Sequence, residues 1–181
     1  MIKAIKGASA LALVLASGAA YAETNLTVST WAGPNHSMNA KVFPRIAEIL
    51  ESCAGGDMKV KIEYGLAPPP AQYDTVRDGV ADMTWIVHGY TPGKFVTTKL
   101  AELPGIPGNA EQISVAYQMT HEKYLASAGE AKGVEVLTNF VHGPGLLNTV
   151  DPLDNGYASI DGMKLRVGGG VANMIGSALG V

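Results

Sequence analysis

The sequence of 181 residues is poor in cysteine and in charge. It contains a single cysteine, Cys53, so an intramolecular disulfide framework is excluded. Charged residues make up 16% of the chain, and no basic stripe is present that would attract nucleic acid. The four histidines are scattered without the spacing of metal ligands, so we expect no zinc or iron site.

Enzyme signatures are missing as well. The sequence has no G-x-S-x-G nucleophile elbow, no H-E-x-x-H motif and no Walker loop. The glycine run at residues 168–170 matches two glycines of a dinucleotide fingerprint, but Asn173 stands where the third glycine belongs. We therefore expect neither a cofactor nor catalysis. The weaker alternative is an exported hydrolase or lyase in which His88 serves as the base.

The chain also lacks an apolar run of about 20 residues, the length that a membrane-spanning helix needs. Its first 22 residues instead combine Lys3 and Lys6, a short apolar stretch, and the small residues Ala20 and Ala22. This pattern predicts a signal peptide over residues 1–22 with cleavage after Ala22, and hence a periplasmic protein.

What the chain does have is 47% hydrophobic residues in patterns that alternate between strand and helix. Regular alternation or β-branched runs predict strands, and apolar spacings of three and four predict helices. The order of elements favours an α/β fold with a largely parallel sheet. The predicted strands are residues 26–31, 58–64, 83–87, 134–141, 146–150 and 163–167, and the predicted helices are residues 42–53, 71–80, 111–128 and 171–179.

Ligand sites of parallel sheets lie outside the carboxyl ends of the strands. This rule points to the loops that follow Thr30, Tyr64 and Val87. Trp31 and Trp85 end or lie in two of these strands, where an aromatic pair suits an organic acid with an apolar body. Each tryptophan taken alone is equally compatible with an ordinary core position.

Arg166 is the most informative single residue. It stands in an otherwise apolar predicted strand, two residues before the glycine run that opens the last helix. A buried guanidinium is costly unless an anion meets it, and its planar fork matches a carboxylate. The nearby helix N-terminus would add positive potential. The competing interpretation is a surface arginine paired with an acidic residue.

Six motifs in order along the chain carry a family resemblance. The sequence resembles the solute-binding proteins of TRAP (tripartite ATP-independent periplasmic) transporters of the DctP type, from about Leu26 to the last residue. The motifs are LTVSTW at residues 26–31, PPAQYD at 69–74, VRDGVAD at 76–82, HGYTPGKF at 88–95, ELP at 102–104 and DGMKLRV at 161–167.

The resemblance implies a two-lobed α/β clamp of the periplasmic-binding-protein kind, which captures an organic acid and delivers it to membrane permease subunits. Because family members usually have about twice this mature length, we expect residues 23–145 to form lobe one and residues 146–181 to begin a truncated lobe two. The resemblance also implies a monomer without a cofactor. A protein that senses ligand for a receptor kinase would use the same binding chemistry.

The resemblance assigns candidate ligand residues as well. Arg166 matches the strand arginine that binds the substrate carboxylate, and Trp31 and His88 match pocket positions. Gln72 and Asn148 are weaker candidates. Many acid-binding members carry a further arginine where this chain reads HGPGL at residues 142–146. This departure favours a monocarboxylate, or a ligand with a large apolar part, over a dianion.

Overall fold

The computed structural model describes residues 23–181, and the predicted signal peptide at residues 1–22 lies outside the described residues. The first element, β1 (Thr24–Thr30), lies at the centre of a three-stranded sheet between β2 (Met58–Tyr64) and β3 (Met83–Thr84). Both pairings are parallel. The predicted α/β fold with a parallel sheet is therefore confirmed.

The core of this sheet sits at the carboxyl end of β1. Val28, Ser29 and Thr30 have no exposed surface, because strands on both sides and helices on the two faces cover them. Gln72 is equally buried. Its side chain accepts hydrogen bonds from Ser29 Oγ and Thr84 Oγ1, at 2.8 and 2.7 Å, and so ties β1 to β3.

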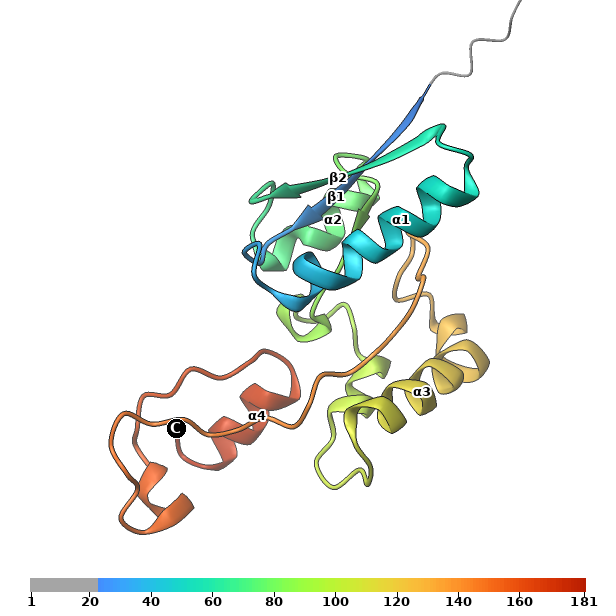
Figure 1. The fold of residues 1–181 in the computed structure, drawn as a ribbon. Helices are drawn as coiled ribbons and strands as arrows, with labels where there is room; N and C mark the ends of the chain where they lie inside the picture. The colour runs from blue at the N-terminus through green and yellow to red at the C-terminus, as the bar shows by residue number, and fades with distance from the viewer. Residues whose placement is uncertain (1–22) are drawn as a thin grey trace, which may run out of the picture.

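Two helices pack on the sheet. α1 (Phe43–Cys53) packs on β2, and α2 (Gln72–Arg77) packs on β1 and β3. Right-handed crossovers in the strand order β2-β1-β3 place these helices on opposite faces. In Figure 1, α1 lies in front of the strands and α2 behind them. Pro44 stands in the first turn of α1, just after the π-helical turn Met38–Val42.

Two further helices lie away from the sheet (Figure 1). α3 (Ala110–Thr120) begins with a capping box between Asn109 and Gln112. α4 (Val171–Ala178) follows the glycine run, close to the C-terminus. Shorter turns of 3₁₀ or π type connect these elements at Met38–Val42, Pro69–Ala71, His88–Tyr90, Thr97–Glu102, His121–Leu125, Ala126–Ala128 and Gly156–Ile160.

Three predicted strands, residues 134–141, 146–150 and 163–167, are not strands in the structure. In the first segment, the backbone N–H groups of Asn139 and Val141 donate to the side chains of Gln118 and Ser114 on α3. The second segment is exposed, with Val150 fully so. An alternating pattern forms a strand only beside a partner strand, and within the described residues these segments have none.

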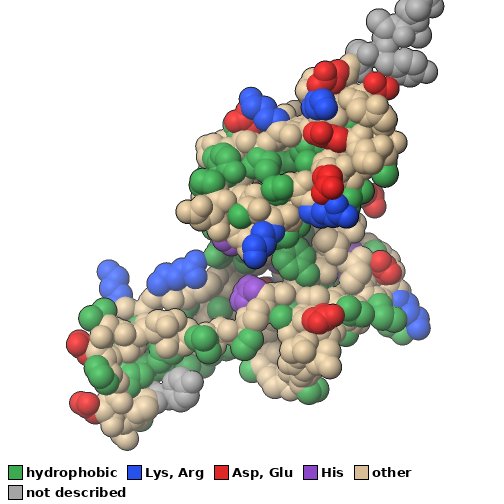
Figure 2. Space-filling view, viewed as in Figure 1, with side chains coloured by type: hydrophobic (Ala, Val, Ile, Leu, Met, Phe, Trp, Pro, Cys, Tyr) green, Lys and Arg blue, Asp and Glu red, His purple; other side chains and the backbone are tan. Residues whose placement is uncertain are grey.

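The part of the chain that carries α3 and α4 joins the sheet through a narrow waist (Figure 2). Histidine side chains are visible at this waist, and Lys and Arg side chains lie along the edge of the α4 segment that faces the sheet. Among residues 23–181, no helix is both long and apolar enough to cross a membrane.

Candidate binding site

The predicted ligand edge of the sheet carries a cluster of aromatic rings. Trp31 directly follows β1, and its ring stacks on Trp85 with 4.6 Å between centroids. Trp85 is held in place because its Nε1 donates to Thr30 Oγ1 at 3.0 Å. His36 stacks on Trp85 at 4.8 Å. Asn39 donates to the carbonyls of Ala32 and Gly33 and so fixes the turn after Trp31.

A cavity of about 250 Å³ opens beside this cluster. Its walls come from all three loops that the strand ends predicted: Trp31 follows β1, Pro69 and Pro70 follow β2, and Tyr90 follows β3. Arg166, from the distant C-terminal segment, completes the lining. The cavity therefore combines flat apolar walls with one cation.

Arg166 is exposed and lies outside regular secondary structure, contrary to the predicted strand. Its Nη2 donates to the Tyr90 hydroxyl at 2.9 Å. None of the ion pairs among residues 23–181 involves Arg166, so the competing prediction of a surface arginine paired with an acid is not what the structure shows. An unneutralised guanidinium beside aromatic walls is suited to a carboxylate.

The α4 N-terminus does not add to this positive charge. Glu102 Oε2 accepts a hydrogen bond from the backbone N–H of Val171, the first residue of α4, at 3.2 Å. A carboxylate at this position offsets the positive end of the helix dipole. The positive potential expected from the helix is therefore offset by the Glu102 carboxylate. Arg166 is then the one cationic group that lines the cavity.

Three contacts join residues 166–171 to residues 89–102. Besides the Arg166–Tyr90 and Glu102–Val171 hydrogen bonds, the backbones of Gly89 and Gly169 touch. A Cβ atom placed on Gly169 would lie 1.8 Å from the Gly89 carbonyl oxygen. Only glycine permits this approach, so the glycine run serves a close backbone contact.

His88 does not line the Arg166 cavity. Its ring stacks on Phe95 at 4.4 Å between centroids, and its Nδ1 lies 3.3 Å from the Tyr117 hydroxyl. Burial is the main cause that lowers the pKa of His88, and burial also raises the pKa of Tyr117 to about 12. Both groups are therefore neutral near pH 7, and their placement supports packing of α3 more directly than ligand contact.

The two weaker candidates also lie apart from the cavity. Gln72 has no exposed surface, and its amide also donates to the Ala67 carbonyl at 2.7 Å. Both polar atoms of the Gln72 side chain therefore form hydrogen bonds within the protein. Asn148 is exposed and donates to the Leu146 carbonyl at 3.3 Å, two residues away. Of the five predicted ligand residues, the structure brings together Trp31 and Arg166.

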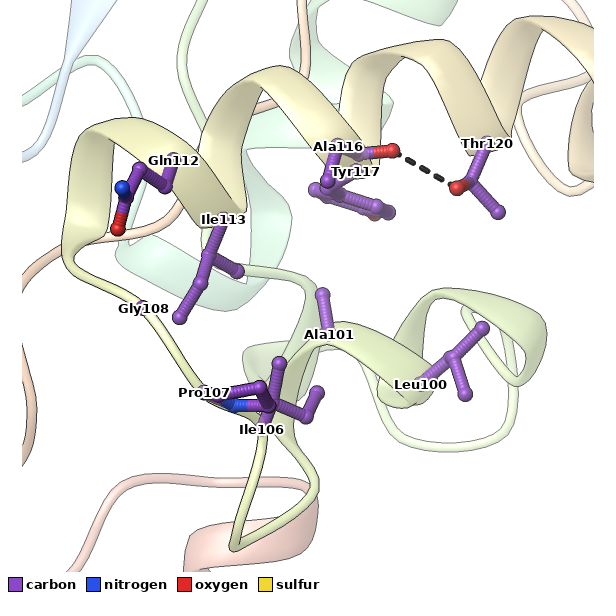
Figure 3. Close-up of a pocket in the computed structure, with 10 residues that line it drawn as sticks. All are labelled: Leu100, Ala101, Ile106, Pro107, Gly108, Gln112, Ile113, Ala116, Tyr117 and Thr120. Carbon is purple, nitrogen blue, oxygen red and sulfur yellow. Dashed lines mark hydrogen bonds between the residues drawn. The ribbon is translucent and has the colours of Figure 1, made fainter.

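A larger hollow of about 620 Å³ lies between α3 and the preceding loop (Figure 3). Ile113 points from α3 toward the loop that carries Ile106 and Pro107. No charged side chain lines this hollow, so a carboxylate would find no cationic partner there. The described residues also contain no group of three potential metal ligands. The smaller cavity at Arg166 is therefore the candidate site.

The chain is similar in sequence to a known transport protein. No protein-family model matches the chain. The chain is 29% identical over 164 residues to a curated protein of Comamonas testosteroni named outer membrane transporter protein TsaT. This match covers 90% of the chain and 48% of that protein.

Several solved structures are also similar. A TRAP periplasmic solute-binding protein from Bordetella bronchiseptica with bound mandelate is 35% identical, with a TM-score of 0.81, over 87% of this chain and 50% of that one. A marine metagenome TRAP solute-binding protein specific for aromatic acid ligands is 33% identical, with a TM-score of 0.80, over 88% and 50%. A Rhodoferax ferrireducens TRAP solute-binding protein in complex with benzoate is 28% identical, with a TM-score of 0.79, over 87% and 49%.

These relatives are solute-binding and transport proteins rather than enzymes. The chain spans about half the length of each relative it matches. Across that span it keeps both the sequence similarity and the α/β arrangement. In sequence and in fold, the chain is thus similar to the TRAP periplasmic solute-binding proteins over about half of their length.

Proposed function

We propose that this chain takes part in periplasmic capture of an aromatic monocarboxylate for a TRAP transporter. The observation that carries the proposal is the unpaired Arg166 guanidinium in a cavity walled by Trp31, Tyr90 and two prolines. The similar TRAP proteins from Bordetella and Rhodoferax hold mandelate and benzoate, which are aromatic acids with one carboxylate. One cation and flat apolar walls match that chemistry.

In the proposed complex, Arg166 binds the carboxylate and the ligand ring lies against Trp31 and the Pro69–Pro70 wall. Aromatic rings favour offset or edge contacts with tryptophan, and burial of the ring supplies the apolar part of the affinity. A cavity of about 250 Å³ is smaller than the ~300–1,000 Å³ of drug-sized ligand pockets, which favours a small acid. No covalent chemistry is involved.

The wider role follows from the family. Residues 23–145 would belong to lobe one of a clamp and residues 146–181 to lobe two, and ligand binding would stabilise the closed arrangement. The closed, monomeric protein would present the acid to membrane permease subunits from the periplasm, where a cleaved signal peptide at residues 1–22 would deliver it. The same chemistry would serve a sensor for a receptor kinase. We favour transport, because the curated relative is named as a transporter protein.

Thermal unfolding in the presence of carboxylates tests the proposal. A ligand at 100 times its Kd stabilises the folded state by about 2.7 kcal/mol, which raises the Tm by roughly 5–10 °C for a chain of this size. We expect benzoate, mandelate and 3-hydroxybenzoate to produce this rise, and acetate to produce little. Arg166→Ala should abolish the rise, because no other cation lines the cavity.

Lys164→Ala is the matched control. Lys164 is exposed and lies two residues from Arg166, so its removal subtracts the same charge from the same segment without touching the cavity. It should retain the benzoate response. Equal responses of the Arg166→Ala variant and the unaltered chain would overturn the assignment of Arg166, and the absence of any response to the aromatic acids would overturn the proposed function.

A further inference from the structure

Tyr90 joins the two halves of the candidate site. Its ring meets Trp31 edge-on, with 6.0 Å between centroids and a 68° angle between planes. Its hydroxyl is the hydrogen-bond partner of Arg166 Nη2 at 2.9 Å. Tyr90 therefore lies between Trp31 and Arg166. An aromatic acid bound there would have its ring near Trp31 and its carboxylate near Arg166.

The direction of the Arg166–Tyr90 hydrogen bond leaves one proton unused. A guanidinium has five N–H donors and no acceptor, so the Tyr90 oxygen must be the acceptor. The hydroxyl keeps its own proton, and it donates this proton to no other group in the described part of the chain. Because a donated bond polarises the oxygen that receives it, the remaining O–H becomes a better donor.

The position of the Tyr90 hydroxyl is not set by that hydrogen bond alone. Tyr90 directly follows Gly89, whose backbone touches Gly169, three residues after Arg166. The hydrogen bond from Val171 to Glu102 joins the C-terminal segment to the next turn after Tyr90, Thr97–Glu102. These two contacts, at Gly169 and Val171, hold the chain just after Arg166 against the loop that carries Tyr90, and so keep the hydroxyl and the guanidinium next to each other, as two donors to one anion require.

We propose that Tyr90 is a second ligand-contacting residue, whose hydroxyl donates a hydrogen bond to one carboxylate oxygen while Arg166 binds the other. This inference rests on the proposed function, because it names a further residue of the same site. It predicts that two hydrogen-bond donors, the Tyr90 hydroxyl and the Arg166 guanidinium, recognise the two oxygens of a carboxylate. Only Arg166 neutralises its charge.

The test compares Tyr90→Phe with the unaltered chain in calorimetric titrations with benzoate. The substitution keeps the ring that contacts Trp31 and removes only the hydroxyl. A hydrogen bond to a charged group is worth enough that its loss should weaken benzoate binding about tenfold. The Tm of the ligand-free variant should stay within about 2 °C of the original, since a half-buried hydroxyl is lost and no apolar contact changes.

Tyr124→Phe is the control, because Tyr124 is 62% exposed and lies beyond the end of α3, away from the cavity. It should bind benzoate as the unaltered chain does. If the unaltered chain binds benzoate and Tyr90→Phe binds it within twofold of the same affinity, the role of Tyr90 is refuted while the proposed function stands. If no aromatic acid binds the unaltered chain, the proposed function fails and the inference fails with it.

Discussion

Two regions of the chain have similar strand patterns in their sequence and different structures. Residues 24–30 and 58–64 form parallel strands along their whole length, and Val28 on the central strand is completely buried. Residues 134–150 carry patterns of the same kind, yet Leu146 is 81% exposed and Val150 is fully exposed. The comparison teaches that alternation of side chains is a condition for a strand, and that a paired neighbour decides whether one forms.

The sheet region and the C-terminal region, here residues 134–181, also contribute differently to the candidate site. The sheet region supplies aromatic and proline walls, since Trp31 directly follows the buried end of β1 and Trp85 is hydrogen-bonded to Thr30 there. The C-terminal region supplies the cation from a segment without regular structure. The contact between Gly89 and Gly169 is where this segment is fixed against the loop that follows β3. Substitutions in each region therefore test different properties.

The largest expected difference is between two valines. Val28→Asn should lower the free energy of unfolding by about 3–5 kcal/mol, because it removes apolar burial and leaves an amide without partners in the core. Val150→Asn should change it by less than about 0.5 kcal/mol, because Val150 is fully exposed. Urea unfolding of both variants measures the contrast. Similar losses at the two positions would contradict the exposure of residues 146–150.

Gln72→Ala tests whether the sheet region uses this side chain for its own stability. The variant leaves the Ser29 hydroxyl without its acceptor, while the Thr84 hydroxyl keeps the Ser29 carbonyl at 2.9 Å. Together with the lost side-chain volume, we expect a loss of about 3 kcal/mol in the free energy of unfolding. Benzoate affinity of the folded fraction should change little. A variant of unaltered stability that no longer bound benzoate would instead restore the predicted ligand role of Gln72.

Gly169→Ala sharpens the comparison at the point where the regions meet. Its methyl group would collide with the Gly89 carbonyl, and the backbones must separate at a cost of about 2 kcal/mol. Because Tyr90 and Arg166 flank this contact, benzoate affinity should fall as well. Gly143→Ala is the matched control, since a Cβ atom there meets nothing within 4 Å. Equal behaviour of the two variants would show that the glycine contact does not hold the site together.

The sequence predicted β1 and β2 well because the patterns that define them are local, whereas only Met83 and Thr84 of the predicted strand 83–87 form β3. The alternation of residues 58–64 and the β-branched run of residues 26–31 coincide with β2 and most of β1, and the predicted last helix coincides with α4. The predicted strands after residue 133 were wrong for a non-local reason. The hydrogen bonds from Asn139 and Val141 to α3 side chains depend on tertiary packing, which alternation in the sequence cannot report.

In the candidate site as well, local features could be predicted from the sequence and tertiary contacts could not. The rule about strand ends selected three loops, and each of them lines the cavity. Which residue of a loop reaches the cavity could not be derived: His88 was the candidate after β3, but Tyr90, two residues later, lines it. Trp31 lines the same cavity as Arg166 because it directly follows the buried end of β1, and its contact with a ligand stays a prediction. The positive end of the helix dipole near Arg166 is offset by the carboxylate of Glu102. This contact could not be predicted, because Glu102 and Val171 are 69 residues apart in the sequence.

The most direct measurement of the central claim is the fluorescence of the chain's own tryptophans during titration with benzoate. The sequence has two tryptophans, and they stack on each other at the cavity, so their emission reports on this site. We expect a saturable change in the unaltered chain and in Lys164→Ala, and no change in Arg166→Ala. A flat titration of the unaltered chain, or an undiminished signal in Arg166→Ala, would contradict carboxylate binding by Arg166 beside Trp31.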